Sequence, residues 1–266
     1  MTVFLSQAAF RLGSGVFANG YEISLVPRND FKYTIATLGE KYQIFETSTI
    51  PPKLVQTEPL ILYEFESCPF CRKVREAVSI LSLTVTYRPC PKNGNRYRRE
   101  IKGKYGAKAT FPFLVDPNTG AEMFESDNIL KYLFQTYGDG TIPWTLPLSN
   151  PIVPLTAGMG LLFRGTRGAM YKSSNPPPLP MQVWLYEGSP FCKLVRETLC
   201  ELELEHTQVS CPRGSPNRQK FFEEKGRFQV PYLEDPNSGV CLYESEAIIE
   251  YLQKQYGVSP SPVKYL

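Results

Sequence analysis

The sequence predicts an α/β protein made of two tandem copies of one small domain, with an N-terminal extension and a connector rich in Pro and Gly. Three observations lead to this fold class: a repeat of about 75 residues, alternating strand-like and helix-like stretches in each copy, and a Cys-x-x-Cys pair between the first strand and first helix of copy one. The predicted boundaries are an extension at 1–57, copy one at 58–138, the connector at 139–180, copy two at 181–257 and a tail at 258–266.

The repeat is visible in three blocks that stay in register apart from a gap of two residues. Cys71 of copy one aligns with Cys192 of copy two, and Ser189 stands where copy one has Cys68. The matching blocks are 62–76 with 184–197, 111–120 with 230–239, and 125–138 with 244–257. A match of this length is not a chance similarity, so the two copies are expected to share one fold.

Composition excludes several classes of protein. With 42% hydrophobic and 21% charged residues, the 266-residue chain is typical of a globular protein. Its net charge of +3 gives no indication of nucleic-acid binding, and its longest uncharged apolar stretch, 152–163, is too short to span a membrane. The single histidine, His206, excludes zinc sites and catalytic arrangements that need several imidazoles. The first residues lack the pattern of a signal peptide, although a trimmed targeting sequence remains open.

The extension at 1–57 has three β-prone stretches separated by turn residues. They lie at 22–26, 32–36 and 42–46. We expect them to form a small sheet.

Copy one alternates between strands and helices. Strands are predicted at 60–65, 84–87 and 112–115, helices from Pro69, within 95–104 and at 127–137, a hairpin turn at 116–120, and a helix cap at Ser126. The order βαβ followed by ββα, with Cys-x-x-Cys after the first strand, is typical of a thioredoxin fold.

The connector at 139–180 ends in a Pro-rich segment, 176–180, that predicts a stiff spacer. Its middle, 155–170, is apolar and rich in small residues, so we expect a helix that packs between the two copies. Docking of this stretch on a partner or on a membrane surface stays open as an alternative. Copy two then repeats the element order of copy one.

The cysteines are the main candidates for chemistry. Cys68 precedes a helix whose N-terminus, with Arg72 and Arg75, would favour the reactive thiolate, and Cys71 would be its resolving thiol. Two reduced structural thiols are the alternative, and no metal site is expected because four ligands are not at hand. Cys192 lacks a partner cysteine, and the repeated Cys90 and Cys211 suggest packing. Seven cysteines, an odd number, favour a reducing compartment.

Each copy, about 58–138 and 181–257, resembles the N-terminal, glutathione-binding domain of glutathione transferases. Copy one is also similar to glutaredoxins through Cys68-Pro-Phe-Cys71, and the whole arrangement resembles the plastid tandem-domain transferase-like proteins of plants and algae. In such transferases an all-helical domain follows and forms the pocket for the electrophile. Here a second thioredoxin-like copy stands in its place, so we do not expect a conventional transferase activity.

The resemblance implies a glutathione site in each copy. Pro112 and Pro231 match the family's cis-proline, and the residue before each would bind glutathione through its main chain. Ser189 would hydrogen-bond the thiolate of glutathione, as in serine-type transferases, or is a turn residue of a degenerate site. The implied glutathione-binding residues are Phe111, Pro112, Glu125 and Ser126 in copy one, and Ser189, Val230, Pro231, Glu244 and Ser245 in copy two. Helix capping is the alternative explanation for the two serines of the Glu-Ser pairs.

Two functions follow. The first is a glutathione-linked thiol-disulfide protein in which Cys68 attacks a disulfide and glutathione or Cys71 resolves the product. The second is a non-catalytic protein that docks on a plastid or thylakoid complex during its assembly or repair. The resemblance implies a chloroplast location, in the stroma or on the stromal face of the thylakoid.

Copy one contains a basic stretch that could contact a binding partner. Between Arg88 and Lys108 there are eight Lys or Arg residues and one acid, Glu100. A solvated face is the default interpretation. The alternative is contact with an acidic protein surface or with anionic lipid headgroups at the membrane periphery.

Overall fold

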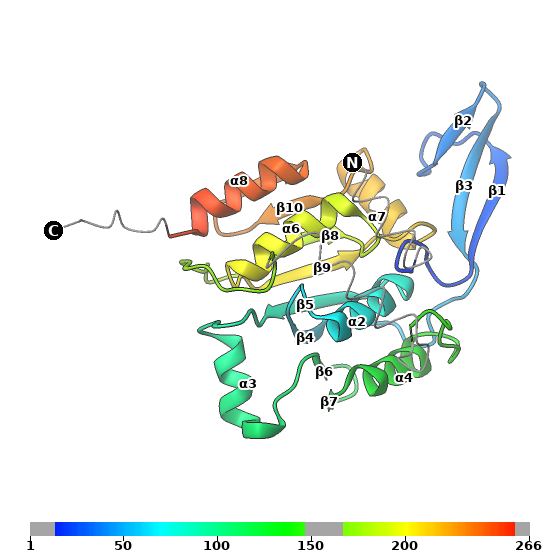
Figure 1. Ribbon diagram of the computed structural model, residues 1–266. Coiled ribbons are helices and arrows are strands. Elements are labelled where there is room, and N and C mark those ends of the chain that lie inside the picture. The colour runs from blue at the N-terminus through cyan, green and yellow to red at the C-terminus, as the bar shows by residue number, and fades with distance from the viewer. Residues whose placement is uncertain (1–13, 147–166, 259–266) are drawn as a thin grey trace.

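The computed structural model describes residues 14–146 and 167–258. It has one large sheet that contains both copies and a separate three-stranded sheet formed by the extension (Figure 1). In this part of the chain, no helix combines the length and the apolar character needed to cross a membrane.

Copy one has the element order that its sequence predicts. Its elements are β4 (Leu60–Glu64), α2 (Pro69–Ile80), β5 (Thr84–Pro89), α3 (Tyr97–Tyr105), a 3-10 turn (Gly106–Lys108), β6 (Phe113–Asp116), β7 (Ala121–Phe124) and α4 (Ser126–Tyr137). Parallel β4 and β5 flank the crossover helix α2, and β6 pairs antiparallel with β4. The α/β fold class is confirmed.

Copy two repeats these elements. They are β8 (Met181–Leu185), α6 (Pro190–Glu201), β9 (His206–Ser210), α7 (Pro216–Lys225), β10 (Tyr232–Asp235), β11 (Val240–Tyr243) and α8 (Ser245–Tyr256). In both copies Pro occupies the first turn of the first helix, where its missing N–H is not needed.

The two copies share one continuous sheet. Its strand order is β11-β10-β8-β9-β5-β4-β6-β7, and the antiparallel pair β5–β9 joins the copies. Thr86 lies opposite Thr207, its own equivalent in the repeat, and their Oγ1 atoms are 3.0 Å apart. An approximate two-fold axis therefore passes between these threonines, so the strand ends that precede Cys68 and Ser189 point in opposite directions.

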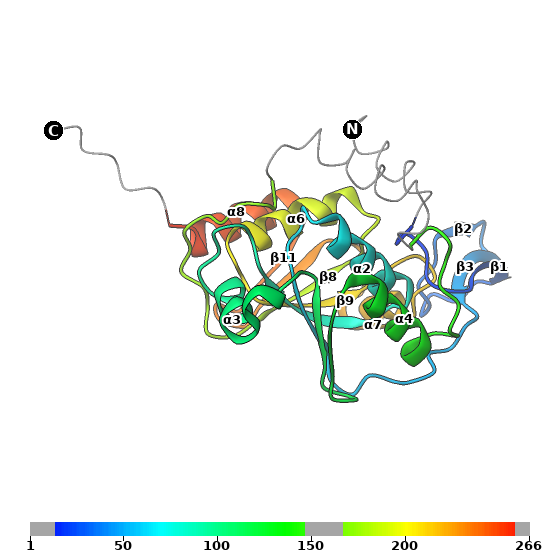
Figure 2. The ribbon, with the colours of Figure 1, turned by 60° about the horizontal axis from the view of Figure 1, so that its bottom comes forward.

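Helices cover both faces of this sheet. The pairs α2 with α4 and α6 with α8 lie on one face, whereas α3 and α7 lie on the other (Figure 2). Alternating strand residues supply the two layers, so Leu62 packs under α2 and the neighbouring Tyr63 packs under α3. Each copy thus has its own apolar core on each face of the sheet.

A buried network of charges joins the copies between α2 and α6. Arg75 pairs with Glu64, Glu66 and Glu187, and its equivalent Arg196 pairs with Glu66 and Glu187. The Arg75 Nε–Glu187 Oε2 and Arg196 Nε–Glu66 Oε2 distances are 3.1 and 3.2 Å, so each arginine binds a glutamate of the other copy. All five side chains are buried, and removal of one would leave an uncompensated charge, which costs about 3–5 kcal/mol.

Two short segments cross the boundary between the copies in equivalent ways. We call residues 15–19 strap one and residues 168–172 strap two. Each strap makes the same four kinds of main-chain hydrogen bond, at positions that the repeat relates. Strap one bonds Gly188 N, Arg213 N, Arg213 O and Ile80 O, and strap two bonds Ser67 N, Lys92 N, Lys92 O and Glu201 O. Each strap thus lies beside the candidate site of one copy and ends on the first helix of the other.

A glycine fits each strap against the charge network. Gly15 and Gly168 have φ of +78° and +70°. A Cβ added to Gly168 would lie 2.7 Å from the Cβ of Glu66, and one added to Gly15 would lie 3.0 Å from the Cβ of Glu187. Of the helix expected over 155–170, residues 155–166 lie outside the described residues, and 167–170 form a turn and a bridge instead of a helix.

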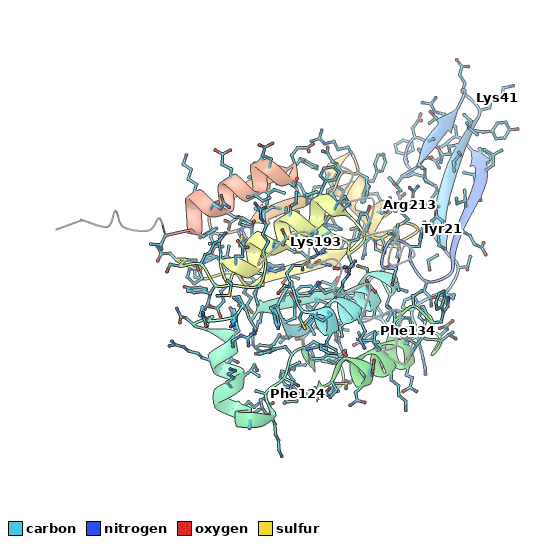
Figure 3. The ribbon with its side chains drawn as sticks, viewed as in Figure 1. Tyr21, Lys41, Phe124, Phe134, Lys193 and Arg213 are labelled. Atoms are coloured by element: carbon cyan, nitrogen blue, oxygen red, sulfur yellow. The ribbon has the colours of Figure 1, made fainter. Side chains whose placement is uncertain are left out.

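The extension forms a sheet of β1 (Tyr21–Pro27), β2 (Ala36–Leu38) and β3 (Tyr42–Ser48) in the order β1-β3-β2. We call it the extension sheet. Tyr21 and Arg213 meet at its base, whereas Lys41 lies at its far end (Figure 3). The strand expected at 32–36 is wrong, because Tyr33 docks on α7 through Gln219 and the strand starts only at Ala36.

Candidate functional site

Cys68 caps the N-terminus of α2. Its Sγ accepts a hydrogen bond from the backbone N of Cys71 at 3.3 Å, because the cap position lies one turn before that N–H. The Cys68 thiol also lies 3.9 Å from the carbonyl oxygen of Phe111, to which it donates. Only 4% of Cys68 is exposed, so its side chain is largely shielded from solvent.

The two thiols of copy one have different acidities. The hydrogen bond from the Cys71 side chain lowers the pKa of Cys68, and backbone N–H groups of Cys71 and Phe70 add to this effect against the opposing effect of burial. Burial raises the pKa of Cys71 well above its ordinary value. Cys68 is therefore the thiol of the pair that ionises more readily, and Cys71 is the one that keeps its proton more strongly.

The expected help from two arginines is wrong. Arg72 pairs with Glu76, 3.2 Å from Nε to Oε1, and Arg75 belongs to the buried charge network. Their charges are thus compensated by carboxylates, one of which, Glu187, comes from copy two. The thiolate of Cys68 is stabilised by hydrogen bonds at the helix N-terminus instead.

The predicted cis-prolines are confirmed. The Phe111–Pro112 and Val230–Pro231 bonds are both cis. In copy one this loop contacts the Glu-Ser pair directly, since Thr110 Oγ1 donates to Glu125 Oε1 at 3.3 Å. The structure thus brings Cys68, Phe111, Pro112 and Glu125 to one end of the copy-one sheet.

The role expected for Ser126 as a helix cap is wrong. Glu125 is the cap residue of α4, with φ of +69°, and neither residue makes a side-chain cap bond. Ser126 is the first residue of the helix and is buried. Its backbone N–H belongs to the first turn, where helix N–H groups have no partner within the helix and attract anionic groups. Capping therefore does not account for the serine.

Copy two reproduces this geometry with a serine in place of Cys68. Ser189 Oγ accepts from the backbone N of Cys192 at 3.3 Å, as Cys68 does from Cys71. Burial raises the pKa of Cys192, whose side chain is part of the copy-two core. Gln229 donates to Glu244, and Ser245 again starts a helix after a residue with positive φ. Copy two can offer a hydroxyl and backbone groups to a ligand, but not a thiol at this position.

An arginine beside each site was missed from the sequence. Arg98 lies over the rings of Phe65 and Phe111, at 5.1 and 4.7 Å, and Arg218 lies over Phe228 at 4.5 Å. The signal was an Arg that follows the Cys-Pro motif by seven or eight residues in both copies. The two-residue gap in the repeat hid this match.

Cys90 and Cys211 have the buried positions of structural cysteines, whereas Cys241 is exposed. Cys90 and Cys211 are fully buried, and burial raises the pKa of each, which agrees with the packing role predicted for them. All seven cysteines are free thiols. Across 14–146 and 167–258 there is no group of three or more His, Cys, Asp or Glu side chains that could hold a metal ion.

Comparison with known proteins adds a family. The family model described as "Glutathione S-transferase, N-terminal domain" matches residues 62–141 and 185–260, which together are more than half of the chain. The two matched segments coincide with the two copies of the thioredoxin-like fold described above.

Individual relatives match over a single copy length. Glutathione S-transferase GstB of Escherichia coli K12 is 38% identical over 77 residues, 28% of this chain and 37% of the relative. Glutathione S-transferase hmp2 of Hypomyces subiculosus is 35% identical over 78 residues, 29% of this chain and 36% of the relative. The chain thus spans about a third of the length of these curated relatives. Among solved structures, a trimeric glutathione transferase of Leishmania, TDR1, aligns with a TM-score of 0.27 at 15% identity, over 77% of this chain and 68% of that chain.

Proposed function

Since the chain belongs to the family of the glutathione S-transferase N-terminal domain, we propose that copy one is a glutathione-linked thiol-disulfide oxidoreductase with Cys68 as its nucleophile. The observation that supports this proposal is the Cys68–Cys71 pair, in which the outer thiol has a lowered pKa and lies 3.9 Å from the carbonyl oxygen before cis-Pro112.

The proposed reaction uses a mixed disulfide of glutathione and a protein or small thiol. The Cys68 thiolate attacks the glutathione sulfur, the disulfide breaks, and the other partner leaves as a thiol. A second glutathione thiolate then attacks the glutathione sulfur bound to Cys68, which releases oxidised glutathione and restores the thiolate. Alternatively, Cys71 loses its proton and attacks Cys68, which releases glutathione and leaves a Cys68–Cys71 disulfide for two further glutathione molecules to reduce.

The chain's other residues would hold glutathione. In this proposal the main chain of Phe111 binds the cysteinyl part, and Glu125 with the first N–H groups of α4 binds the γ-glutamyl part. In copy two, Val230, Glu244 and Ser245 would bind glutathione around Ser189 without redox turnover. Conventional transfer of glutathione to an electrophile is not proposed, because copy two stands where transferases have a helical domain.

The test is glutathione-dependent reduction of a small glutathione mixed disulfide by the purified reduced protein. We expect turnover in the wild type, loss of turnover in Cys68→Ser, and wild-type turnover in Ser189→Ala. If the wild type shows no turnover above the uncatalysed reaction, the oxidoreductase function is refuted.

A second candidate function is supported by the small exposure of Cys68. A nucleophile that is 4% exposed also fits a non-catalytic protein whose two folds dock on a complex, and we propose the plastid, in the stroma or at the stromal face of the thylakoid, as the compartment of either function. Free thiols at all seven cysteines agree with a reducing compartment. Affinity capture from fractionated plastids, with a thylakoid wash as the control, tests this candidate and the location together.

A further inference from the structure

Three polar side chains of copy two hydrogen-bond the extension, and a fourth side chain, Phe228, packs on the ring of Tyr33 with centroids 4.9 Å apart. Glu46 of β3 is buried, and its carboxylate accepts from Arg213 Nε at 3.0 Å and from Arg218 Nη1 at 2.9 Å. Gln219 binds the loop of the same sheet: its Nε2 donates to Phe31 O at 3.0 Å and its Oε1 accepts from Tyr33 N at 2.8 Å. Arg213, Arg218 and Gln219 thus form the docking surface of copy two.

Copy one carries cations at the three equivalent positions, which we call the α3 surface: Lys92, Arg98 and Arg99. The equivalence is structural as well as sequential. Arg98 Nε donates to the carbonyls of Cys90 and Pro91 at 3.0 and 2.8 Å, and Arg218 Nε donates to the carbonyls of the matching Cys-Pro at 3.2 and 2.9 Å. The main chain of Lys92 pairs with strap two as that of Arg213 pairs with strap one.

The α3 surface has no acidic partner within 14–146 and 167–258. No ion pair of a described carboxylate with Lys92, Arg98 or Arg99 is present there, and Lys92 and Arg99 are exposed. The neutral Gln219 of copy two is replaced by Arg99, so the surface of copy one is more positive than its occupied counterpart. Among the described residues, the protein therefore has one docking surface with a bound carboxylate and an equivalent one without it.

We propose that the α3 surface binds an acidic, extended segment of a partner protein, with a carboxylate held between Lys92 and Arg98 as Glu46 is held between Arg213 and Arg218. Charge complementarity indicates an acidic partner. The occupied counterpart indicates a peptide rather than a lipid headgroup, because there the carboxylate belongs to a β-strand and main-chain groups make further hydrogen bonds. The inference does not depend on turnover at Cys68.

The first test measures binding of a fluorescent hexaglutamate peptide by anisotropy at low salt, where charge pairs are least screened. We expect one bound peptide per wild-type chain and at least tenfold weaker binding for the double variant Lys92→Glu, Arg99→Glu. Lys131→Glu, an exposed cation on α4, is the matched control and should leave affinity unchanged. Arg98 is left intact because it holds the carbonyls of Cys90 and Pro91. Equal binding by the double variant and the wild type would overturn the proposal.

The second test uses the occupied surface of copy two. The double variant Glu46→Gln, Gln219→Ala removes both the charge and the Gln219 hydrogen bonds that hold the extension, so a second peptide should bind and the stoichiometry should rise from one to two. A stoichiometry that stays at one would contradict the equivalence of the two surfaces. Displacement of hexaglutamate by S-methylglutathione, which has the carboxylates but no free thiol, would assign the cations to the small-molecule site. Retention on phosphatidylglycerol vesicles without peptide binding would assign them to lipid, and either result would overturn the proposal.

Discussion

At the scale of single residues, the two copies differ most informatively at their first helix caps. Cys68 and Ser189 each accept a hydrogen bond from the backbone N–H three residues later, at the same distance of 3.3 Å, so the main chain around them is equivalent. The difference is therefore the acidity of the cap side chain: the pKa of the Cys68 thiol is lowered, whereas a serine hydroxyl does not ionise in water. The lowered pKa depends first on the Cys71 side chain, which makes it open to a direct test.

Replacement of Cys71 by Ala should raise the pKa of Cys68, because the thiolate loses its strongest hydrogen-bond donor. The pH midpoint of Cys68 alkylation by iodoacetamide, read by mass spectrometry, should therefore move upward. Cys71→Ser is the matched control, since its hydroxyl can still donate and should keep the midpoint near that of the wild type. A midpoint that is the same in Cys71→Ala and in the wild type would mean that backbone N–H groups alone set the acidity.

His206, the single histidine, should make the protein less stable in mild acid. Burial lowers its pKa from 6.5 to about 4 in the folded state, so between these values the unfolded chain binds a proton that the folded chain does not. Stability is then complete above pH 6.5 and falls as pH decreases toward 4, by up to about 3 kcal/mol. The measurement is the NMR titration of the imidazole together with urea unfolding at several pH values.

His206→Val is the matched control, because Val85 occupies the equivalent position in copy one. Buried carboxylates are common to both proteins, so the difference between their pH profiles isolates the imidazole. Parallel profiles from pH 4 to 6.5 would show that His206 titrates alike in the folded and unfolded states.

How far the sequence predicts a residue's role depends on where its partners lie. The two cis-prolines are confirmed, and Cys68 lies directly before the first helix of copy one as predicted, since both features depend on neighbours within one motif of one copy. The redox roles of Cys68 and Cys71 stay a prediction. The roles of Arg72 and Arg75 were predicted wrongly, because Glu187 reaches them from copy two across a boundary that no local pattern reveals.

At the scale of elements, the two straps are the feature that is hardest to predict from local sequence patterns. Their bonds to the two copies are main-chain bonds, which almost any side chain permits, so neither periodicity nor composition marks them. The sequence does hold a trace: Phe10-Arg11 and Phe163-Arg164 each precede a strap glycine, Gly15 or Gly168, at the same spacing. The duplicated unit thus includes the segment before each copy, whereas the extension sheet occurs once within 14–146 and 167–258.

Gly168→Ala should weaken the whole structure. The φ of +70° costs an alanine about 1–2 kcal/mol, and the 2.7 Å contact with the Cβ of Glu66 adds about 1–3 kcal/mol, since both atoms are fixed to backbone. The measurement is the urea midpoint by circular dichroism. Gly120→Ala is the matched control, with φ of +76° and nothing within 4 Å of the added Cβ, so it should show only the conformational cost. Equal losses of stability in both variants would mean that strap two moves away from Glu66 at no cost in free energy.

At the scale of the whole molecule, β5–β9 pairing makes two small domains into one body. The sequence predicts the two thioredoxin-like copies but not the sheet that they share. A strand at the edge of a sheet and a strand that pairs with the other copy have the same alternation of side chains, so the sequence pattern does not distinguish them. The pairing also covers two strand edges that would otherwise be open to other chains. Together with the buried charges and the straps, it predicts that the copies unfold in one step.

A pair of substitutions tests this cooperativity. Trp184, buried in copy two, becomes the single tryptophan in Trp144→Phe and reports on copy two alone. Leu62→Ala then opens a cavity in the core of copy one, at a cost of about 2–5 kcal/mol. We expect the urea midpoints read by Trp184 fluorescence and by circular dichroism to fall by the same amount, so that the two unfolding curves stay superimposed. The reason is that the buried arginine of copy two and the straps keep their bonding partners only while copy one is folded. An unchanged Trp184 midpoint beside a two-step circular dichroism curve would show that the copies unfold independently, and would reduce the shared sheet to a contact between two self-sufficient domains.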